Sequence, residues 1–354
     1  MRRIAGIVLA VLLIGGVVAA VVAGRNEDDK GTATKTVRMV IGSEKAEYFS
    51  DPAVVKALAA KGYTVKAETS GSWAMEGLDL EGYDLAFPSS QAPAVELASR
   101  YKVHGTLPRP FYSPLVVVAH RSAAQVLAAN GLATLDTAHR GVLKMSAYVA
   151  AAEQDRTWQQ LKGADKYGEL GGTLFISSTD PESSNSGALY LAAASYVANG
   201  GRVVASKGEL DKTEPLLKKL VSVQGAQQSS SDAVFRDFVS GAGNPLVWVY
   251  ESQVASLLTG GQKPDDLVVL YPDTTVNSDH TVVPLTDNGK ALAELLSTDP
   301  QLRKLAVRHG FRPQGAASEF ASDTTYLKQE LTGVRQAPVP TSAVLHEMAR
   351  RARG

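Results

Sequence analysis

The sequence contains no cysteine among its 354 residues. That absence excludes disulfide bonds, thiol nucleophiles, zinc sites built on cysteine, and lipid anchoring through a cysteine. An excess of one charge sign is also missing, because 36 Lys and Arg balance 36 Asp and Glu. A balanced chain argues against nucleic acid as a partner, since nucleic acid is usually bound by a basic face.

Signatures of catalysis and of metal binding are missing as well. The sequence has no Gly-x-Ser-x-Gly elbow, no His-Glu-x-x-His pair and no glycine-rich phosphate loop. The six histidines are scattered, and His346-Glu347 lacks the second histidine that a metal-binding helix needs. We therefore predict that the protein is not an enzyme and that it uses no cofactor and no metal.

One long hydrophobic run is present, at residues 4–24, and Arg2 and Arg3 precede it. It matches the roughly 20 residues that span a bilayer and exceeds the roughly 7–15-residue core of a secretory signal. We therefore predict a single-pass transmembrane anchor, with the remaining chain on the extracytoplasmic side of the cell membrane. Small residues at 21–23 leave cleavage and secretion as the alternative. A polar spacer follows at residues 25–35.

Polar residues follow each strand predicted in the next part of the chain. Strands are predicted at 36–41, 63–68 and 83–87, and a helix is predicted to begin at Asp51-Pro52 and to end at Gly62. This order is typical of a parallel α/β sheet, whose ligands lie at the carboxyl ends of the strands. The polar ends of the three strands read GSEK, TSGSW and PSSQ.

The densest polar stretch is STDPESSNSG, at residues 178–187, between a strand predicted to end at Ile176 and a helix predicted from Ser186. Free N–H groups and the dipole at a helix N-terminus favour ligands that carry oxygen atoms or negative charge. The alternative is that Ser184 or Asn185 only caps its own helix. The number of hydroxyl groups favours a ligand site.

Two β-rich segments, at 114–119 and 246–250, are predicted to cross between two lobes and so to form a hinge. Helices are also predicted at 148–161, at 210–221 with an interruption at Pro215, and at 231–239. Residues 336–354 are predicted to form a proline-containing linker and a short basic tail. For that tail, a solvated helix is favoured over membrane contact.

The order of GSEK, YDLAFPSSQ, YSPLVVVAH, STDPESSNSG and PLVWVYESQ resembles the extracellular solute-binding proteins of bacterial ABC-type uptake systems. The resemblance covers residues 36–313 and implies the type 2 periplasmic-binding fold, in which two α/β lobes close over a small solute. The implied division is an anchor or signal segment at 1–24, a spacer at 25–35, lobe I at 36–118 and 250–335, lobe II at 119–249, and a linker and tail at 336–354. The implied ligand contacts are Ser43, Glu44, Ser70, Ser72, Ser89, Ser90, Ser184, Asn185, Ser186, Tyr250 and Glu251.

The predicted function is capture of a small polar solute by a membrane-tethered protein, with a membrane permease or another envelope protein as partner. Neutral hydroxyl and N–H donors suit an oxyanion or an organic metabolite, whereas Glu44 argues against a bare anion if it faces the cleft. The alternative is a non-transport sensory or interaction module of the cell envelope that keeps the same fold.

Overall fold

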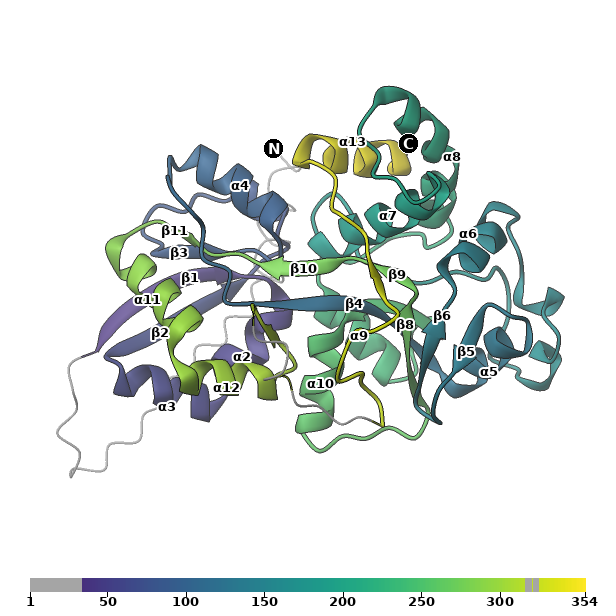
Figure 1. The fold of residues 1–354 in the computed structure, drawn as a ribbon, viewed down its shortest axis with the longest axis horizontal. Helices are drawn as coiled ribbons and strands as arrows, with labels where there is room; N and C mark the ends of the chain where they lie inside the picture. The colour runs from purple at the N-terminus through teal and green to yellow at the C-terminus, as the bar shows by residue number, and fades with distance from the viewer. Residues whose placement is uncertain (1–33, 316–319, 321–324) are drawn as a thin grey trace, which may run out of the picture.

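The computed structural model describes residues 34–315, 320 and 325–354. The predicted anchor at residues 4–24 lies outside these ranges. Within them, no helix is both long and apolar enough to cross a membrane. The described chain forms two α/β lobes that lie side by side (Figure 1).

Lobe I is built on a four-stranded sheet in the order β11-β3-β1-β2. Strand β1 (Lys35–Ile41) pairs in parallel with β2 (Tyr63–Thr69) and with β3 (Leu85–Phe87), and β11 (Val283–Pro284) lies antiparallel to β3. Helices α3 (Pro52–Ala60), α11 (Asp287–Thr298) and α12 (Pro300–Arg308) cover one face. Helix α4 (Gln91–Arg100) covers the other face. All three strands predicted in this part are therefore confirmed.

Helix α3 shows why part of lobe I could be predicted from local sequence. The Asp51 side chain accepts a hydrogen bond from the Ala53 amide at 2.7 Å, and Pro52 occupies the first turn. The helix ends at Ala60, and Gly62 then adopts a φ of +84°, which favours glycine. Capping and termination here are both local, so a sequence pattern is enough to place them.

Lobe II is built around β4 (Phe111–His120), which pairs antiparallel with β7 (Leu246–Tyr250) and with β8 (Leu267–Pro272). Strands β6 (Arg140–Leu143) and β5 (Ala133–Leu135) extend this sheet. One face packs against α5 (Arg121–Ala129), α6 (Met145–Glu153), α7 (Asn185–Ala198) and α8 (Lys207–Ser222). The other face packs against α9 (Ser231–Val239) and α10 (Glu251–Thr259).

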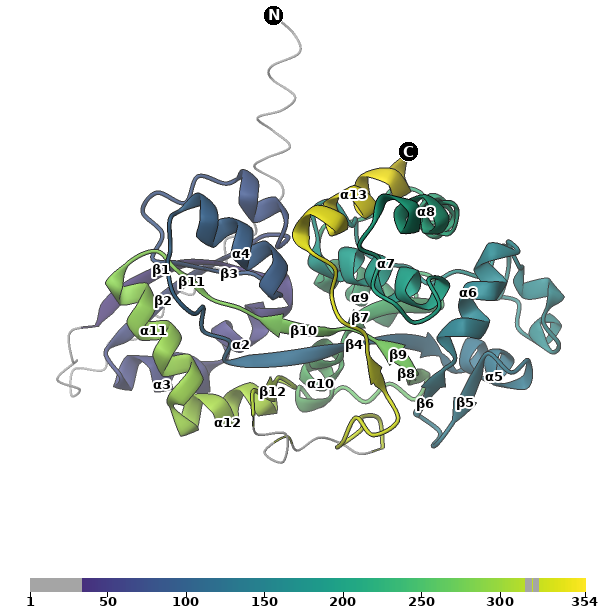
Figure 2. The same ribbon diagram turned by 45° about the horizontal axis from the view of Figure 1, so that its top comes forward.

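The two lobes are joined by β4 and by β10 (Asn277–His280), which pairs antiparallel with the first half of β4 (Figures 1 and 2). The segment at 246–250, expected to be the second crossing, instead pairs along residues 115–119 of β4 inside the lobe II sheet. All five of its residues are buried, so its hydrophobic run marks a central strand. The chain returns to lobe I later, through β10.

Three other expectations differ from the structure. The strand predicted to end at Ile176 is reduced to an isolated bridge between Ser177 and Val247. The helix predicted at 148–161 ends at Glu153, and Asp155 then takes a positive φ of 50°. Helix α8 continues through Pro215, because its capping box at Ser206 and its packing against α7 and α13 (Ser342–Arg353) hold it.

The C-terminal segment is part of lobe II. After β13 (Arg335–Gln336), which pairs with β9 (Thr274–Thr275), helix α13 (Ser342–Arg353) buries Leu345 and Met348 in the core of lobe II. Arg351 is ion-paired with Asp211 and Glu214 of α8. The expectation of a solvated tail is therefore wrong.

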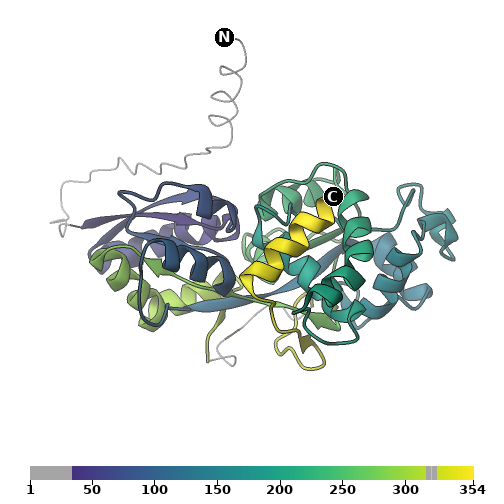
Figure 3. The same cartoon turned by 90° about the horizontal axis from the view of Figure 1, so that it is seen from above.

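Helix α13 also contacts lobe I, as its position across the upper face suggests (Figure 3). The His346 ring lies edge-on to Trp73, with ring centroids 4.5 Å apart. The Ser342 hydroxyl donates to the Ala92 carbonyl of α4 at 3.4 Å. The tail thus bridges the two lobes.

Candidate functional site

The polar ends of β1, β2 and β3 meet at one edge of the lobe I sheet, because parallel strands present their carboxyl ends on the same side. The Ser72 hydroxyl donates to the Ser89 hydroxyl at 3.0 Å and accepts from the Ser89 amide at 2.9 Å. The Ser89 hydroxyl in turn donates to Glu44 Oε1 at 2.7 Å. One side chain from each strand end therefore joins a single hydrogen-bonded group.

Two residues of this group were not among the predicted contacts. Lys45 Nζ pairs with Glu44 Oε1 and lies 3.1 Å from His280 Nδ1 and 3.4 Å from Ser89 Oγ. The ammonium also lies 4.8 Å from the centroid of the Phe87 ring. Lys45 was detectable as the charged neighbour of Glu44, whereas His280 reaches the site through the hinge strand β10 and carries no local signal.

The charges of this group are buried. The Glu44 and Lys45 side chains are 2% and 0% exposed. Burial alone would raise the pKa of the Glu44 carboxyl, but the Lys45 ammonium and the His280 ring outweigh it and hold that pKa below its usual range. Burial also lowers the pKa of Lys45, which Glu44 opposes, and burial beside Lys45 lowers the pKa of His280 to about 4. At neutral pH the site therefore holds an ionised Glu44 carboxylate, paired with Lys45, beside a neutral imidazole.

Lobe II contributes Asn185, the first residue of α7. Its amide nitrogen donates to the Tyr250 hydroxyl at 3.1 Å and to the Ser278 hydroxyl at 3.2 Å. Its amide oxygen accepts from the Ser90 hydroxyl of lobe I at 2.5 Å. Ser278, on β10, donates to the Ser89 carbonyl. Asn185 thus links both lobes and the hinge.

The N-termini of α4 and α7 meet at this contact. Ser90 and Ser184 occupy the two N-cap positions, and neither side chain bonds to an N–H group of its own helix. The first N–H groups of both helices are therefore left without a side-chain cap, unlike those of α8 and α9. Capping, the alternative for Ser184, is not what the structure shows.

Other predicted contacts lie elsewhere. Glu251 is fully buried in a bidentate ion pair with Arg312, at 2.7 and 2.8 Å, and accepts from the Tyr271 hydroxyl. The Ser70 hydroxyl donates to the neighbouring Gly71 carbonyl, and Ser43 is half-buried. The Ser186 hydroxyl lies 2.6 Å from Thr179 Oγ1 and 3.3 Å from Ser184 Oγ. Ligand contact at any predicted position stays a prediction.

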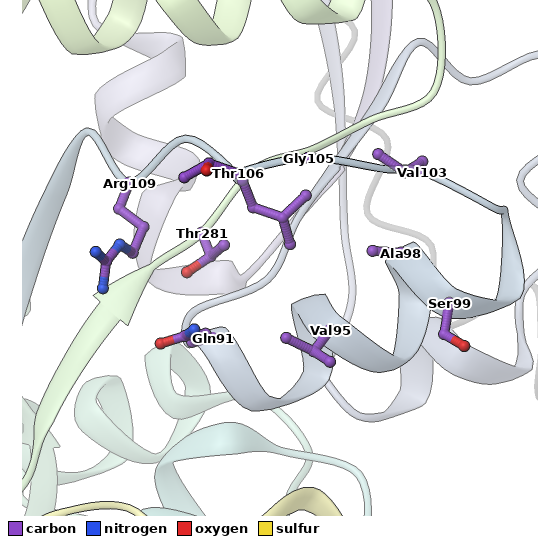
Figure 4. A pocket seen from close by; sticks show the side chains of 10 residues that line it. Gln91, Val95, Ala98, Ser99, Val103, Gly105, Thr106, Arg109 and Thr281 are labelled. Atoms are coloured by element: carbon purple, nitrogen blue, oxygen red, sulfur yellow. The ribbon is translucent and has the colours of Figure 1, made fainter.

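A separate surface pocket of about 400 Å³ lies between α4 and residues 103–109 of lobe I (Figure 4). Gln91, Arg109 and Thr281 line one part of it, and Val95 lies along the helix. Arg109 pairs with Asp279 at 3.6 Å. None of the predicted contacts lines this pocket. Within the described ranges, no group of three or more His, Asp or Glu side chains is placed to hold a metal ion.

Comparison with known proteins identifies the fold. No protein-family model and no curated protein sequence matches the chain. Solved structures do match: iron-bound HitA from Pseudomonas aeruginosa aligns with a TM-score of 0.58 at 12% identity, covering 90% of this chain and 99% of that one. A periplasmic thiamin binding protein aligns with a TM-score of 0.56 at 13% identity, covering 91% of this chain and 97% of that one. The sulfate-binding protein SubI from Mycobacterium tuberculosis H37Rv aligns with a TM-score of 0.53 at 18% identity, covering 81% of this chain and 92% of that one. The chain has the type 2 periplasmic-binding fold.

Proposed function

We propose that this protein is an extracytoplasmic solute-binding protein, tethered to the membrane through residues 4–24, that captures a small polar solute between its lobes and works with an ABC-type permease. Proteins with this fold include binders of iron, thiamin and sulfate. Those solutes differ in charge and size, so the fold supports solute binding and leaves the solute class to the side chains of this chain.

One observation carries the proposal. The uncapped N-termini of α4 and α7, one from each lobe, meet at the Ser90–Asn185 hydrogen bond beside the group formed by Glu44, Lys45 and Ser89. Such N-termini bind oxygen atoms of a ligand through their free N–H groups. Two facing sets on two hinged lobes provide both the binding groups and a means of closure.

Thermal melting of the purified full-length protein against oxyanions, sugars, amino acids and peptides tests the proposal. A solute at 100 times its dissociation constant stabilises the folded state by about 2.7 kcal/mol. We expect Asn185→Ala to lower the affinity for such a solute at least tenfold, and the exposed amide variant Gln301→Ala on α12 to bind like the wild type. A library with no stabilising solute refutes the proposed function, and unchanged affinity in Asn185→Ala refutes this site.

A second candidate is an envelope sensory or interaction module. The observation in its favour is α13, which ties lobe I to lobe II through His346 and Ser342 and so opposes opening. Such a module would show no solute-dependent stabilisation in the same screen, so one experiment separates the two functions.

A further inference from the structure

The Glu44 carboxylate occupies a set of donors provided by its own chain. Its Oε1 receives Lys45 Nζ, accepts from the Ser89 hydroxyl at 2.7 Å and lies 3.3 Å from His280 Nδ1. The three groups come from the end of β1, the end of β3 and the hinge strand β10. An ammonium, a hydroxyl and a ring nitrogen around a buried carboxylate are the surroundings that a bound oxyanion needs.

The backbone is also shaped to hold this carboxylate. A Cβ atom added at Gly42 would lie 2.5 Å from Glu44 Oε2 and 2.3 Å from Ser89 Oγ. Both distances are closer than atoms can approach, so only glycine at position 42 lets the Glu44 side chain fold back against the end of β1. The placement of the carboxylate is thus supported by a steric feature as well as by its donors.

We propose that Glu44 is the internal occupant of an oxyanion site, hereafter the carboxylate cradle (Lys45, Ser89 and His280), and that the cleft therefore takes neutral, hydroxyl-bearing solutes and rejects anions. This inference rests on the proposed function, because it assigns a solute class to the same cleft. It differs from that function in what it predicts for anions.

Charge balance is the first argument. Glu44 and Lys45 cancel, and the imidazole of His280 is neutral at pH 7. A second anion placed beside Glu44 would meet a like charge where burial removes most of the screening by water. The cradle thus has no net positive charge left for an oxyanion.

Donor and acceptor balance is the second argument. The first N–H groups of α4 and α7, which have no side-chain cap, are donors, whereas the hydroxyls of Ser90 and Ser184 can both donate and accept. A hydroxyl group on a solute matches both kinds of partner and brings no charge that needs compensation. Sugars and polyols carry several such groups on one small molecule.

Isothermal titration of the full-length protein tests the inference with sulfate as the anion and with glucose, ribose and myo-inositol as neutral probes. The variants are Glu44→Gln, which removes the internal anion, and Glu44→Gln with Lys45→Gln, which also removes the cation. Glu81→Gln is the matched control, because Glu81 is an exposed carboxylate of lobe I and its loss changes the net charge equally.

We expect no saturable sulfate binding by the wild type or by Glu81→Gln, a gain of at least tenfold in sulfate affinity in Glu44→Gln, and loss of that gain in the double variant. Saturable sulfate binding by the wild type overturns the inference, and that titration decides even if Glu44→Gln does not fold. A folded Glu44→Gln protein that gains no sulfate affinity also overturns it.

The outcomes separate this inference from the proposed function. If the wild type binds a neutral probe but Glu44→Gln gains nothing, solute binding stands and the carboxylate cradle is refuted. If Glu44→Gln gains sulfate affinity but no solute of any class binds the wild type, the carboxylate cradle stands and solute transport is refuted.

Discussion

Acid should destabilise this protein through His280 before it protonates the carboxylates of the site. His280 is fully buried, and its ring packs near Phe111 and Phe311 while Nδ1 lies 3.1 Å from Lys45 Nζ. Burial and the Lys45 charge lower the pKa of His280 from 6.5 to about 4. The unfolded chain therefore binds a proton between these two pH values that the folded chain does not bind.

The sign and size follow from proton linkage. Stability rises with pH wherever the unfolded state binds more protons, so lowering the pH through this window lowers the free energy of unfolding. With pKa values of 6.5 and about 4, the loss from pH 7.5 to pH 5 is about 2 kcal/mol. Glu44, whose pKa is held low, loses its stabilising contribution only at lower pH, as its own folded pKa is approached.

Urea unfolding at pH 7.5 and at pH 5 measures this difference. The free energy of unfolding that the wild type loses between the two pH values is compared with the loss in His280→Asn. Subtracting one loss from the other removes the contribution of the other titrating groups. We expect a difference of about 2 kcal/mol. The exposed His104 provides the control, since His104→Asn should follow the wild type. Equal losses in the wild type and in His280→Asn would refute the assignment of a neutral, buried imidazole beside Lys45.

Two further predictions concern stability. Met348→Ala should lower the free energy of unfolding by about 2–5 kcal/mol in urea titration, because this α13 side chain is fully buried in the lobe II core. The control Val339→Ala, at an exposed position, should change it by less than about 0.5 kcal/mol. Equal effects would show that α13 is not part of that core. Arg312→Met should lower the free energy of unfolding by about 3–5 kcal/mol, because it leaves Glu251 buried and unpaired. The control is Arg38→Met, which breaks the exposed Arg38–Glu68 pair and should lower it by about 1 kcal/mol or less. A small loss for Arg312→Met would contradict the buried pair.

Much of lobe I could be predicted because its signals are local. The hydrophobic pattern marks β1, β2 and β3, and Asp51-Pro52 marks the start of α3. The polar ends of parallel strands converge by geometry, so the meeting of Glu44, Ser72 and Ser89 also followed from the sequence. The helix predicted from Ser186 begins one residue earlier, at Asn185.

The parts that could not be predicted depend on contacts between distant segments. A buried central strand and a strand that crosses between lobes have the same hydrophobic pattern, so Leu246–Tyr250 was read as a crossing. Glu251 follows that strand in a polar run, but its partner Arg312 lies 61 residues away. His280 reaches Glu44 and Lys45 because β10 pairs with β4 where the lobes join. No local pattern encodes either pairing.

The distribution of the hydrophobic core is consistent with hinge motion between the lobes. Two of the four clusters among the described residues lie on the two faces of the β1 sheet in lobe I, and the other two lie on the two faces of the lobe II sheet, one of them including Trp73 of lobe I. Side-chain links between the lobes include the Ser90–Asn185 hydrogen bond, the contacts of α13 with Trp73 and Ala92, and the hydrogen bonds of Ser256 with Glu47 and His309. Each hydrogen bond contributes about 1 kcal/mol net. Opening would break these links together, whereas a solute bound to both lobes would add its binding free energy to the closed state.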